Sequence, residues 1–537
     1  MKAHLLFPDT DLDAAAPARA FEHDIVQDLD LATVLEAMAA GDGFLEVVAR
    51  RVLLSSVTDE AVIRYRQRIL ADCLGHPDVL RQIYSLAVEA MTREKRIYQP
   101  LFAHAASVLR QATDRMTLFV EILRRVRAIA DAHLAKMTSA GLVNLFQMLR
   151  TELSDDYLRE VEDHLHHLRA YDSVLVSAQL GTANRGINYA LRGLSGAHRS
   201  LRERIGIGGR NALSFQIDAG DEAGARALDE LTDRGIDLAA NALAQSAEHV
   251  HHFLLMLATE LAFYVGGCNL HDRLQELGAP ICLPDPLPHE QGALTFSDLR
   301  DVGLTLRTDA PVVGNDLNGG GASLIMVTGA NSGGKSTFLR SLGQAQLMAQ
   351  CGLFVCADAF TSSLCDRVLT HFTRQEDATM TSGKLDEELA RMSDLVDAAT
   401  PWSLVLFNES FAATNEREGS EIARQVVRAL REVGVRVAFV THMYDLASSL
   451  YREGDPAARF LQAERGPDGA RQYKLVEGPP LSTSYGVDLF EHMGGWSGPR
   501  KGFSRKSEGE QSLRAWVAAE GEDEAADEGW SSARKQA

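Results

Sequence analysis

The chain has little cysteine, no long uninterrupted apolar segment and no excess of basic residues, and each shortage excludes a class of protein. Six cysteines at irregular spacing among 537 residues exclude a disulfide framework and fit a reducing cytosol. The longest apolar run, residues 253–267, is short and contains Glu260, so we expect no membrane span. The first residues, MKAHLLFPDTDLD, turn acidic too early for a signal peptide. We therefore expect a cytoplasmic protein, nucleoid-associated if its source is a prokaryote.

The net charge of −20 argues against a surface that coats nucleic acid throughout. Charge is unevenly spread, however, because residues 185–210 contain six arginines and a single glutamate, whereas residues 518–528 are acidic. The arginine cluster is either a phosphate-contacting patch or a solvated face, and the sequence leaves both open. If the cluster contacts DNA, the side chains concerned are Arg185, Arg192, Arg199, Arg202, Arg204 and Arg210.

Periodicity divides the chain into five parts and indicates a multi-domain protein. In residues 1–175 apolar side chains recur every three or four positions, which predicts an all-α region. Residues 176–235 form an arginine-rich insertion with short strand and turn features, and residues 236–290 return to helix before a proline-rich linker. In residues 291–495 strands alternate with helices, as in a doubly wound α/β domain. The polar composition of residues 496–537 predicts a disordered tail.

Residues 328–337 read TGANSGGKST and follow four apolar residues. The spacing G-x-x-x-x-G-K-[ST] after a strand is the phosphate-binding loop pattern, or Walker A motif. Its glycines let backbone N–H groups point at phosphate oxygens, and the following helix presents its positive end to the same anion. We expect Lys335 at the β- and γ-phosphates of ATP and the Ser336 hydroxyl on Mg²⁺. The predicted nucleotide-binding residues are Gly329, Ala330, Asn331, Ser332, Gly333, Gly334, Lys335, Ser336 and Thr337.

Two further strands end in polar residues that would complete such a site. Residues 404–407 are apolar and lead into Asn408 and Glu409, at the strand edge where ligands bind in α/β sheets. We expect Glu409 to orient or deprotonate the attacking water, the alternative being a helix-capping or surface carboxylate. Asn408 stands where an aspartate normally holds Mg²⁺, and its neutral amide is a weaker ligand. A third strand, residues 435–440, leads to His442, which we expect to sense the γ-phosphate as a second catalytic residue.

Taken together, four stretches resemble the MutS family of ATPases, a branch of the ABC-type superfamily. They are, in chain order, TGANSGGKSTFLRSLGQAQLMAQCGLFVCA, SLVLFNESFAATNEREGSEIA, VAFVTHMYDL and STSYGVDLF. The resemblance implies that residues 291–495 form a P-loop ATPase domain of ABC type. It extends more loosely over residues 15–490, and it implies a core and lever region in residues 1–175 and a clamp in residues 176–235.

The resemblance also implies a homodimer with two composite ATP sites. Each site would be completed by a loop of the partner chain, here Ser382, Gly383 and Lys384 at the start of a helix. The family usually has a Ser-Thr pair at that place, so this match is imperfect. Asn331 matches a family asparagine near the γ-phosphate. In the family the ATP state is coupled to a clamp on DNA, so the resemblance implies double-stranded or branched DNA as a partner.

Three departures from the family pattern limit what the resemblance implies. The chain opens in the helical core without the mismatch-reading domain, whose Phe-x-Glu wedge is not matched by Phe21-Glu22-His23. Asn408 replaces the expected aspartate. A polar tail replaces the usual C-terminal dimerisation helices, although ATP can itself bridge two subunits.

We therefore expect an ATP-dependent, DNA-binding ATPase of MutS type, a dimeric clamp that recognises DNA structure in mismatch repair, other repair or recombination. The first alternative is a nucleotide-gated scaffold that hydrolyses little ATP, which Asn408 motivates. The second is an ABC-type ATPase that acts on a protein partner, which the acidic net charge favours and the arginine cluster opposes.

Overall fold

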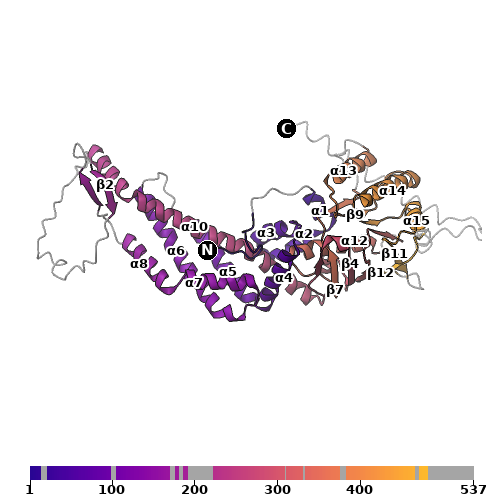
Figure 1. Cartoon of the computed structure of the whole chain (residues 1–537), viewed down its shortest axis with the longest axis horizontal. Coiled ribbons are helices and arrows are strands. Elements are labelled where there is room, and N and C mark those ends of the chain that lie inside the picture. The colour runs from indigo at the N-terminus through magenta and orange to yellow at the C-terminus, as the bar shows by residue number, and fades with distance from the viewer. Residues whose placement is uncertain are drawn as a thin grey trace, which may run out of the picture. The chain divides into compact units, whose positions relative to one another are not determined.

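The computed structural model describes residues 1–13, 21–97, 105–169, 176–180, 186–191, 222–308, 310–329, 333–374, 383–465 and 471–481. The chain divides into two compact units, Met1–Ser484 and Tyr485–Ala537, and the described residues belong to the first. Within this unit a mostly helical part comes first in the chain, and two β-sheets with their covering helices follow it (Figure 1).

Among the described residues before residue 277, the regular elements are helices and one antiparallel pair of strands. Local signals start several of the helices, since Asp42 accepts from the Phe44 N–H at 2.9 Å and Pro77 opens α5. The elements are α1 (Glu22–Asp28), α2 (Leu31–Ala39), α3 (Gly43–Leu53), α4 (Glu60–Gly75), α5 (Pro77–Glu94), α6 (Ala105–His133), η1 (Leu134–Lys136), α7 (Ala140–Glu152), α8 (Asp155–Arg169), β1 (Val176–Leu180), β2 (Gly186–Leu191) and α10 (Glu222–Glu276).

Helix α10 is the long element around which the helical part is built. It packs against α6, α5, α3 and α2, and it begins at Glu222 rather than near residue 236, where the sequence predicted its start (Figure 1). Its portion Ile236–Glu276 is long and apolar enough to cross a membrane, but 89% of the most apolar window is buried inside the protein. This stretch therefore has the burial of a core helix.

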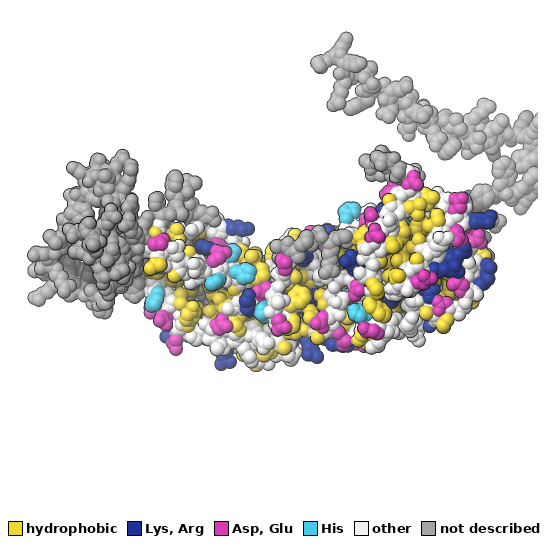
Figure 2. Space-filling view, turned by 45° about the horizontal axis from the view of Figure 1, so that its top comes forward, with side chains coloured by type: hydrophobic (Ala, Val, Ile, Leu, Met, Phe, Trp, Pro, Cys, Tyr) yellow, Lys and Arg dark blue, Asp and Glu magenta, His cyan; other side chains and the backbone are white. Residues whose placement is uncertain are grey.

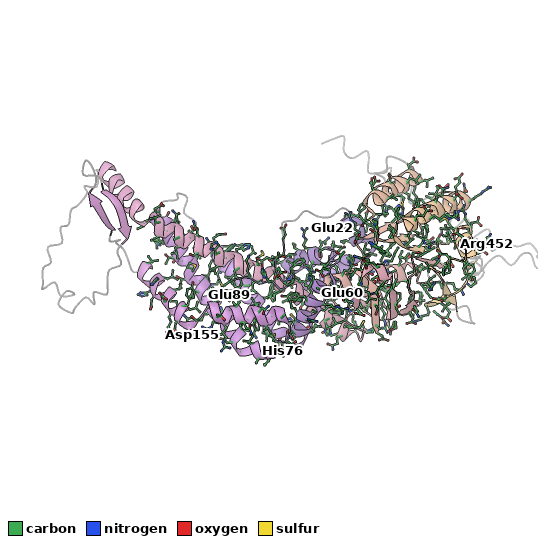
Figure 3. The ribbon with its side chains drawn as sticks, in the orientation of Figure 1. Glu22, Glu60, His76, Glu89, Asp155 and Arg452 are labelled. Atoms are coloured by element: carbon green, nitrogen blue, oxygen red, sulfur yellow. The ribbon has the colours of Figure 1, made fainter. Side chains whose placement is uncertain are left out.

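Ion pairs join neighbouring helices at the surface of this part. Glu89 of α5 accepts from Arg125 of α6 at 2.9 Å, and Asp155 at the start of α8 accepts from Arg127 of α6 at 2.6 Å (Figure 3). Such exposed pairs contribute little each, about 0–1 kcal/mol, so the buried apolar side chains between the helices supply most of the stability.

The N-terminal residues, which have no regular secondary structure, are held inside the helical part. Leu5 and Leu6 are fully buried, and Glu260 of α10 accepts from the N–H groups of Leu5 at 2.5 Å and Leu12 at 3.1 Å. Arg66 of α4 donates to the Leu6 carbonyl at 2.7 Å. Side chains of α10 and α4 thus supply hydrogen-bond partners for the main chain of a segment that forms no strand or helix of its own.

The second part contains a six-stranded sheet in the order β12-β11-β6-β10-β9-β8. All neighbouring strands are parallel except the pair β11 and β12. Every residue of β6 and β10 is buried, as expected for central strands covered on both faces. The strands are β6 (Leu324–Thr328), β8 (Val368–Phe372), β9 (Leu404–Asn408), β10 (Arg436–Val440), β11 (Ala458–Arg465) and β12 (Arg471–Glu477).

A second sheet, which the sequence did not reveal, has four strands in the order β3-β7-β4-β5. They are β3 (Asp285–Leu287), β4 (Leu294–Leu299), β5 (Asn315–Asn318) and β7 (Ala359–Ser363). Because β3 pairs with β7, the stretch predicted as a linker before residue 291 contributes a strand to this sheet. The accompanying helices are η3 (His289–Gln291), α11 (Val302–Arg307), α12 (Lys335–Cys351), α13 (Lys384–Ala398), α14 (Glu416–Glu432) and α15 (Tyr444–Arg452).

Candidate active site

The carboxyl ends of three parallel strands meet at one edge of the six-stranded sheet. Val440 of β10 lies opposite Val327 of β6 on one side and Asn408 of β9 on the other. The three strands therefore end level with one another, and the residues that follow them come together although they are distant in the sequence. This is the edge at which open α/β sheets bind ligands.

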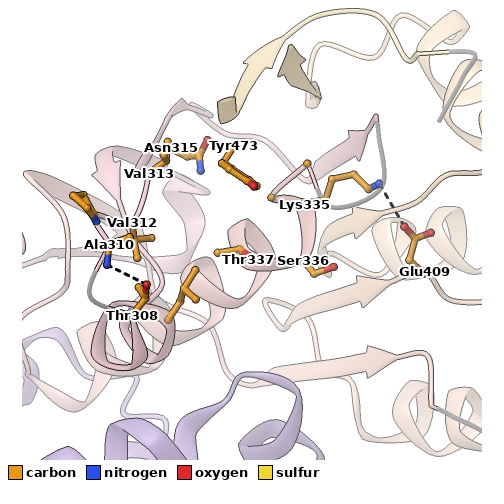
Figure 4. Close-up of a pocket in the computed structure, with 14 residues that line it drawn as sticks. Thr308, Ala310, Val312, Val313, Asn315, Lys335, Ser336, Thr337, Glu409 and Tyr473 are labelled. Atoms are coloured by element: carbon orange, nitrogen blue, oxygen red, sulfur yellow. Dashed lines mark hydrogen bonds and ion pairs between the residues drawn. The ribbon is translucent and has the colours of Figure 1, made fainter. Parts of the chain in front are cut away.

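Lys335, the first residue of α12, places its ammonium group at this edge with only 5% of the side chain exposed. Its Nζ donates to the Gly329 carbonyl at 2.8 Å and lies 3.7 Å from Oε1 of Glu409 (Figure 4). Burial lowers the pKa of Lys335, and the negative charge of Glu409 opposes this effect. A buried cation at a helix N-terminus favours the binding of an anionic oxygen.

Two glycines of the predicted phosphate loop occupy places that exclude a side chain. Gly329 and Gly334 have left-handed φ angles of 121° and 91°. A Cβ atom on Gly329 would lie 2.9 Å from the Ala463 nitrogen, and one on Gly334 would lie 3.1 Å from the Tyr473 carbonyl oxygen. The central residues of the loop lie outside the described part of the chain: Ala330, Asn331 and Ser332.

The Ser336 hydroxyl donates to Oδ1 of Asn408 at 2.8 Å, so the two predicted metal ligands contact each other. Both offer oxygen atoms, which suit a hard cation, but neither carries a charge. The described residues contain no group of three or more His, Cys, Asp or Glu side chains that could hold a metal ion. This donor set fits Mg²⁺, which keeps several waters and takes other ligands from substrate phosphates.

Glu409 and His442, predicted as catalytic residues, form a pair. Oε2 of Glu409 accepts from the backbone N–H of His442 at 3.0 Å and lies 2.6 Å from its Nδ1. This hydrogen bond to Glu409 raises the pKa of His442, which favours the charged imidazolium. Glu409 is not a helix cap, because its carboxylate contacts Lys335 and His442 at the strand edge.

A pocket of roughly 610 Å³ opens beside Lys335, within the usual range for a small-molecule site. Its polar end contains the loop residues, and its other end is an apolar wall that the sequence did not reveal (Figure 4). No local pattern distinguishes that wall, because its residues lie in α11 and between α11 and β5, well before the phosphate loop in the chain. The lining residues are Leu304, Thr308, Ala310, Pro311, Val312, Val313, Asn315, Gly333, Gly334, Lys335, Ser336, Thr337, Glu409 and Tyr473.

Other predicted residues lie away from this pocket or outside the described residues. Gly383 precedes α13 and Lys384 is its first residue, and neither lines the pocket of the same chain. Ser382 lies outside the described residues, as does the whole predicted DNA-contacting set: Arg185, Arg192, Arg199, Arg202, Arg204 and Arg210.

Comparison with known proteins matches both parts of the chain. Residues 58–277 match the family model described as MutS2 N-terminal domain, and residues 325–495 match MutS domain V. The chain is 35% identical to the DNA mismatch repair protein MutS of Chloroflexus aurantiacus over 191 residues, which are 34% of this chain and 20% of that protein. It is 31% identical to the DNA mismatch repair protein MutS 2 of Halobacterium salinarum over 190 residues, 35% and 22% of the two chains.

The match thus spans about a fifth of the length of these relatives. The two family models, however, cover most of the helical part and most of the part that contains the two sheets, which we call the α/β part. The α/β part carries the strand-edge site, formed by Lys335, Ser336, Glu409 and His442. The chain belongs to the MutS family.

Proposed function

We propose that the strand-edge site binds and hydrolyses ATP and that ATP binding is coupled to DNA. The observation that carries the proposal is the meeting of Lys335, Ser336, Glu409 and His442 at the ends of β6, β9 and β10. A phosphate-binding lysine, a hydroxyl that can hold Mg²⁺ and a carboxylate that can position the attacking water are groups used in phosphoryl transfer to water. The apolar wall of the pocket offers room for a nucleotide base beside them.

Each side chain has a distinct part in the proposed hydrolysis. Lys335 binds the β- and γ-phosphate oxygens, because its charge is buried and already directed at the loop carbonyl of Gly329. Glu409 orients the attacking water and accepts its proton, and His442 lies against the same carboxylate, where it can contact the γ-phosphate. Ser336 and Asn408 would hold Mg²⁺, which when bound neutralises charge that develops on the phosphate oxygens.

We further propose that the ATPase domain is of ABC type and that two copies of the chain form two composite sites. Ser382, Gly383 and Lys384 would then complete the site of the partner, which agrees with the absence of Gly383 and Lys384 from the described lining of their own pocket. Helix α13 exposes Leu389 and Val396 by 39% and 45%, and Figure 2 shows hydrophobic side chains at the surface of the α/β part. Exposed apolar side chains on α13 support a protein partner at this helix.

The DNA partner rests on the family and on the arginine cluster. The relatives are named as DNA mismatch repair proteins, and the cluster of Arg185 to Arg210 lies within the residues that match the MutS2 N-terminal family model. We propose that this insertion contacts double-stranded or branched DNA through phosphates. Replacing Arg199, Arg202 and Arg204 with alanine should weaken DNA binding and make its dependence on salt concentration shallower. An unchanged salt dependence would favour a protein partner instead.

The test of the ATPase is Mg²⁺-dependent hydrolysis by the purified chain with and without branched duplex DNA. Lys335→Ala should abolish nucleotide binding, and Glu409→Gln should retain binding but lower turnover by roughly 100-fold or more, as for loss of a general base. Asp394→Ala, which removes an exposed carboxylate from α13, is the matched control and should leave turnover unchanged. Turnover that survives Glu409→Gln would reject Glu409 as the catalytic base.

Asn408 favours a second candidate, a nucleotide-gated scaffold with little hydrolysis. Its amide oxygen accepts from Ser336 without bringing the negative charge that Mg²⁺ prefers. Asn408→Asp separates the two candidates. If the missing charge limits turnover, the variant should hydrolyse ATP faster and reach half-saturation at a lower Mg²⁺ concentration. If turnover is absent in both proteins while nucleotide still binds, the scaffold is the better description.

A further inference from the structure

A strained turn follows the strand that leads to Glu409. Glu409 and Phe411 have left-handed φ angles of 55° and 62°, although neither is glycine. Residues with a Cβ atom persist at such angles only where surrounding contacts hold them. The direction of the Glu409 side chain therefore depends on whatever fixes this turn.

Hydrogen bonds from two neighbouring elements fix the turn at both ends. Thr373, just after β8, donates its hydroxyl proton to the Glu409 carbonyl at 2.6 Å. The Phe411 N–H donates to Oε2 of Glu388, in α13, at 3.1 Å. The sheet thus holds the first residue of the turn, and α13 holds the last.

His371 of β8 fills the space between the turn and α13. Its ring stacks on Phe411 with a centroid distance of 5.6 Å, and its Nε2 lies 3.1 Å from the Glu388 carbonyl. Its Nδ1 lies 2.7 Å from the hydroxyl of Ser410, the middle residue of the turn. Turn, strand and helix are therefore packed as one buried cluster, in which a displacement of one member displaces the others.

Glu388 is an unusual residue for such a place. Its side chain is 2% exposed, and its Oε1 has no hydrogen-bond partner among the described residues. Burial raises the pKa of Glu388, because a charged carboxylate is poorly solvated there. An apolar side chain would fill the space without leaving a buried oxygen unpaired. Compared with an apolar side chain, the carboxyl group of Glu388 adds one interaction, the hydrogen bond that it accepts from the Phe411 N–H.

We propose that Glu388 is a positioning residue that ties the direction of the Glu409 side chain to the position of α13. The inference rests on the proposed function, in which Glu409 acts on the attacking water and the start of α13 faces the partner's nucleotide. Glu388 lies about one helical turn after Lys384, so a displacement of that end of α13 carries the carboxyl with it. Nucleotide binding at one site of the dimer thereby changes the direction of the Glu409 side chain at the other site.

Three variants of the full chain test the role in turnover: Glu388→Ala, Glu388→Gln and the exposed control Asp394→Ala on the same helix. Glu388→Ala should lower kcat by roughly tenfold or more while the Kd for ATP changes by less than about twofold, because binding groups stay in place and the base is misdirected. Glu388→Gln should recover most of the rate, since its amide oxygen can still accept from the Phe411 N–H. Asp394→Ala should behave as the wild type.

A second measurement reads the direction of Glu409 without any turnover. The pKa of His442 is raised chiefly by its hydrogen bond to Glu409, so it reports whether that contact persists. In an NMR titration of histidine-labelled protein, with His442→Gln to assign the signal, Glu388→Ala should return this pKa toward 6.5. Glu388→Gln and Asp394→Ala should leave it raised.

The two readouts separate failure of this inference from failure of the proposed function. If the wild type hydrolyses no ATP but His442 responds to Glu388→Ala, hydrolysis is rejected and the positioning role stands. If neither kcat nor the pKa of His442 changes in Glu388→Ala, the positioning role is overturned. It is also overturned if Glu388→Ala and Glu388→Gln lose nucleotide affinity and melting temperature together, because Glu388 would then only stabilise the fold.

Discussion

Glu409 is shared between the side chains of Lys335 and His442. Its Oε1 lies 3.7 Å from the Lys335 ammonium and its Oε2 lies 2.6 Å from Nδ1 of His442. In the proposed reaction this carboxylate binds the attacking water, so its contacts with Lys335 and His442 compete with the binding of that water. Anionic phosphate oxygens compete for Lys335 in turn, since opposite charges attract strongly in a buried site. Arrival of nucleotide would thus release one oxygen of the carboxylate for the water.

The backbone of the phosphate loop can be tested at Gly334. We predict that Gly334→Ala lowers ATP affinity by roughly tenfold or more, because its Cβ would combine left-handed strain with a contact against Tyr473. Gly454 is the control, since it has a φ of 63° and nothing within 4 Å of its added Cβ. Gly454→Ala should cost about 1 kcal/mol of stability and leave affinity unchanged. Calorimetric titration with nucleotide and urea unfolding measure both effects.

Among the elements, α12 joins the site to the helical part. It begins at Lys335 and ends at Cys351, whose carbonyl accepts from Arg66 of α4 at 3.3 Å. Arg66 also donates to the Leu6 carbonyl, so the last turn of α12 is held next to the N-terminal segment. The sequence predicted the start of α12 from the loop pattern. It could not predict the contacts of its end, because Arg66 is 285 residues away.

The docked N-terminal segment should contribute strongly to stability. We predict that Leu5→Ala lowers the unfolding free energy by about 2–5 kcal/mol, because Leu5 is fully buried and its removal leaves a cavity beside α10. Leu238→Ala is the matched control, since that leucine lies on α10 and is 80% exposed. It should change stability by less than about 0.5 kcal/mol. Equal effects of the two substitutions on urea unfolding would show that the segment is not docked in solution.

For the whole molecule, a feature could be predicted from the sequence where it depends on residues that are neighbours in the chain, and could not where it depends on contacts between distant residues. The phosphate loop is a local strand–turn–helix pattern, and Glu409 and His442 follow apolar strands directly, so each could be recognised from its neighbours in the chain. The second sheet depends on pairings such as β3 with β7, and the apolar wall of the pocket is formed by α11 and the residues between α11 and β5; no local pattern predicts either. Glu260 was noted only as a charge within an apolar run, whereas the structure gives it two backbone partners.

Two buried groups give the molecule opposing dependences of stability on pH. Burial raises the pKa of Glu260 from 4.5 to about 7 and lowers the pKa of His371 from 6.5 to about 4. As pH rises from 4.5 to 7, the folded chain keeps a proton on Glu260 that the unfolded chain has lost, so stability falls. As pH rises from 4 to 6.5, the unfolded chain loses a proton from His371 that the folded chain does not hold, so stability rises.

Each group contributes roughly 3 kcal/mol, at about 1.36 kcal/mol for each unit of difference between folded and unfolded pKa values. Because the two windows overlap between pH 4.5 and 6.5, we predict that the effects largely cancel there in the wild type. Relative to the wild type, Glu260→Gln should make the slope of the unfolding free energy against pH more positive over this window, and His371→Gln should make it more negative. Urea unfolding at closely spaced pH values measures both slopes. Changes of slope of the same sign in the two variants would contradict the assignment, because one buried acid and one buried base shift the slope in opposite directions.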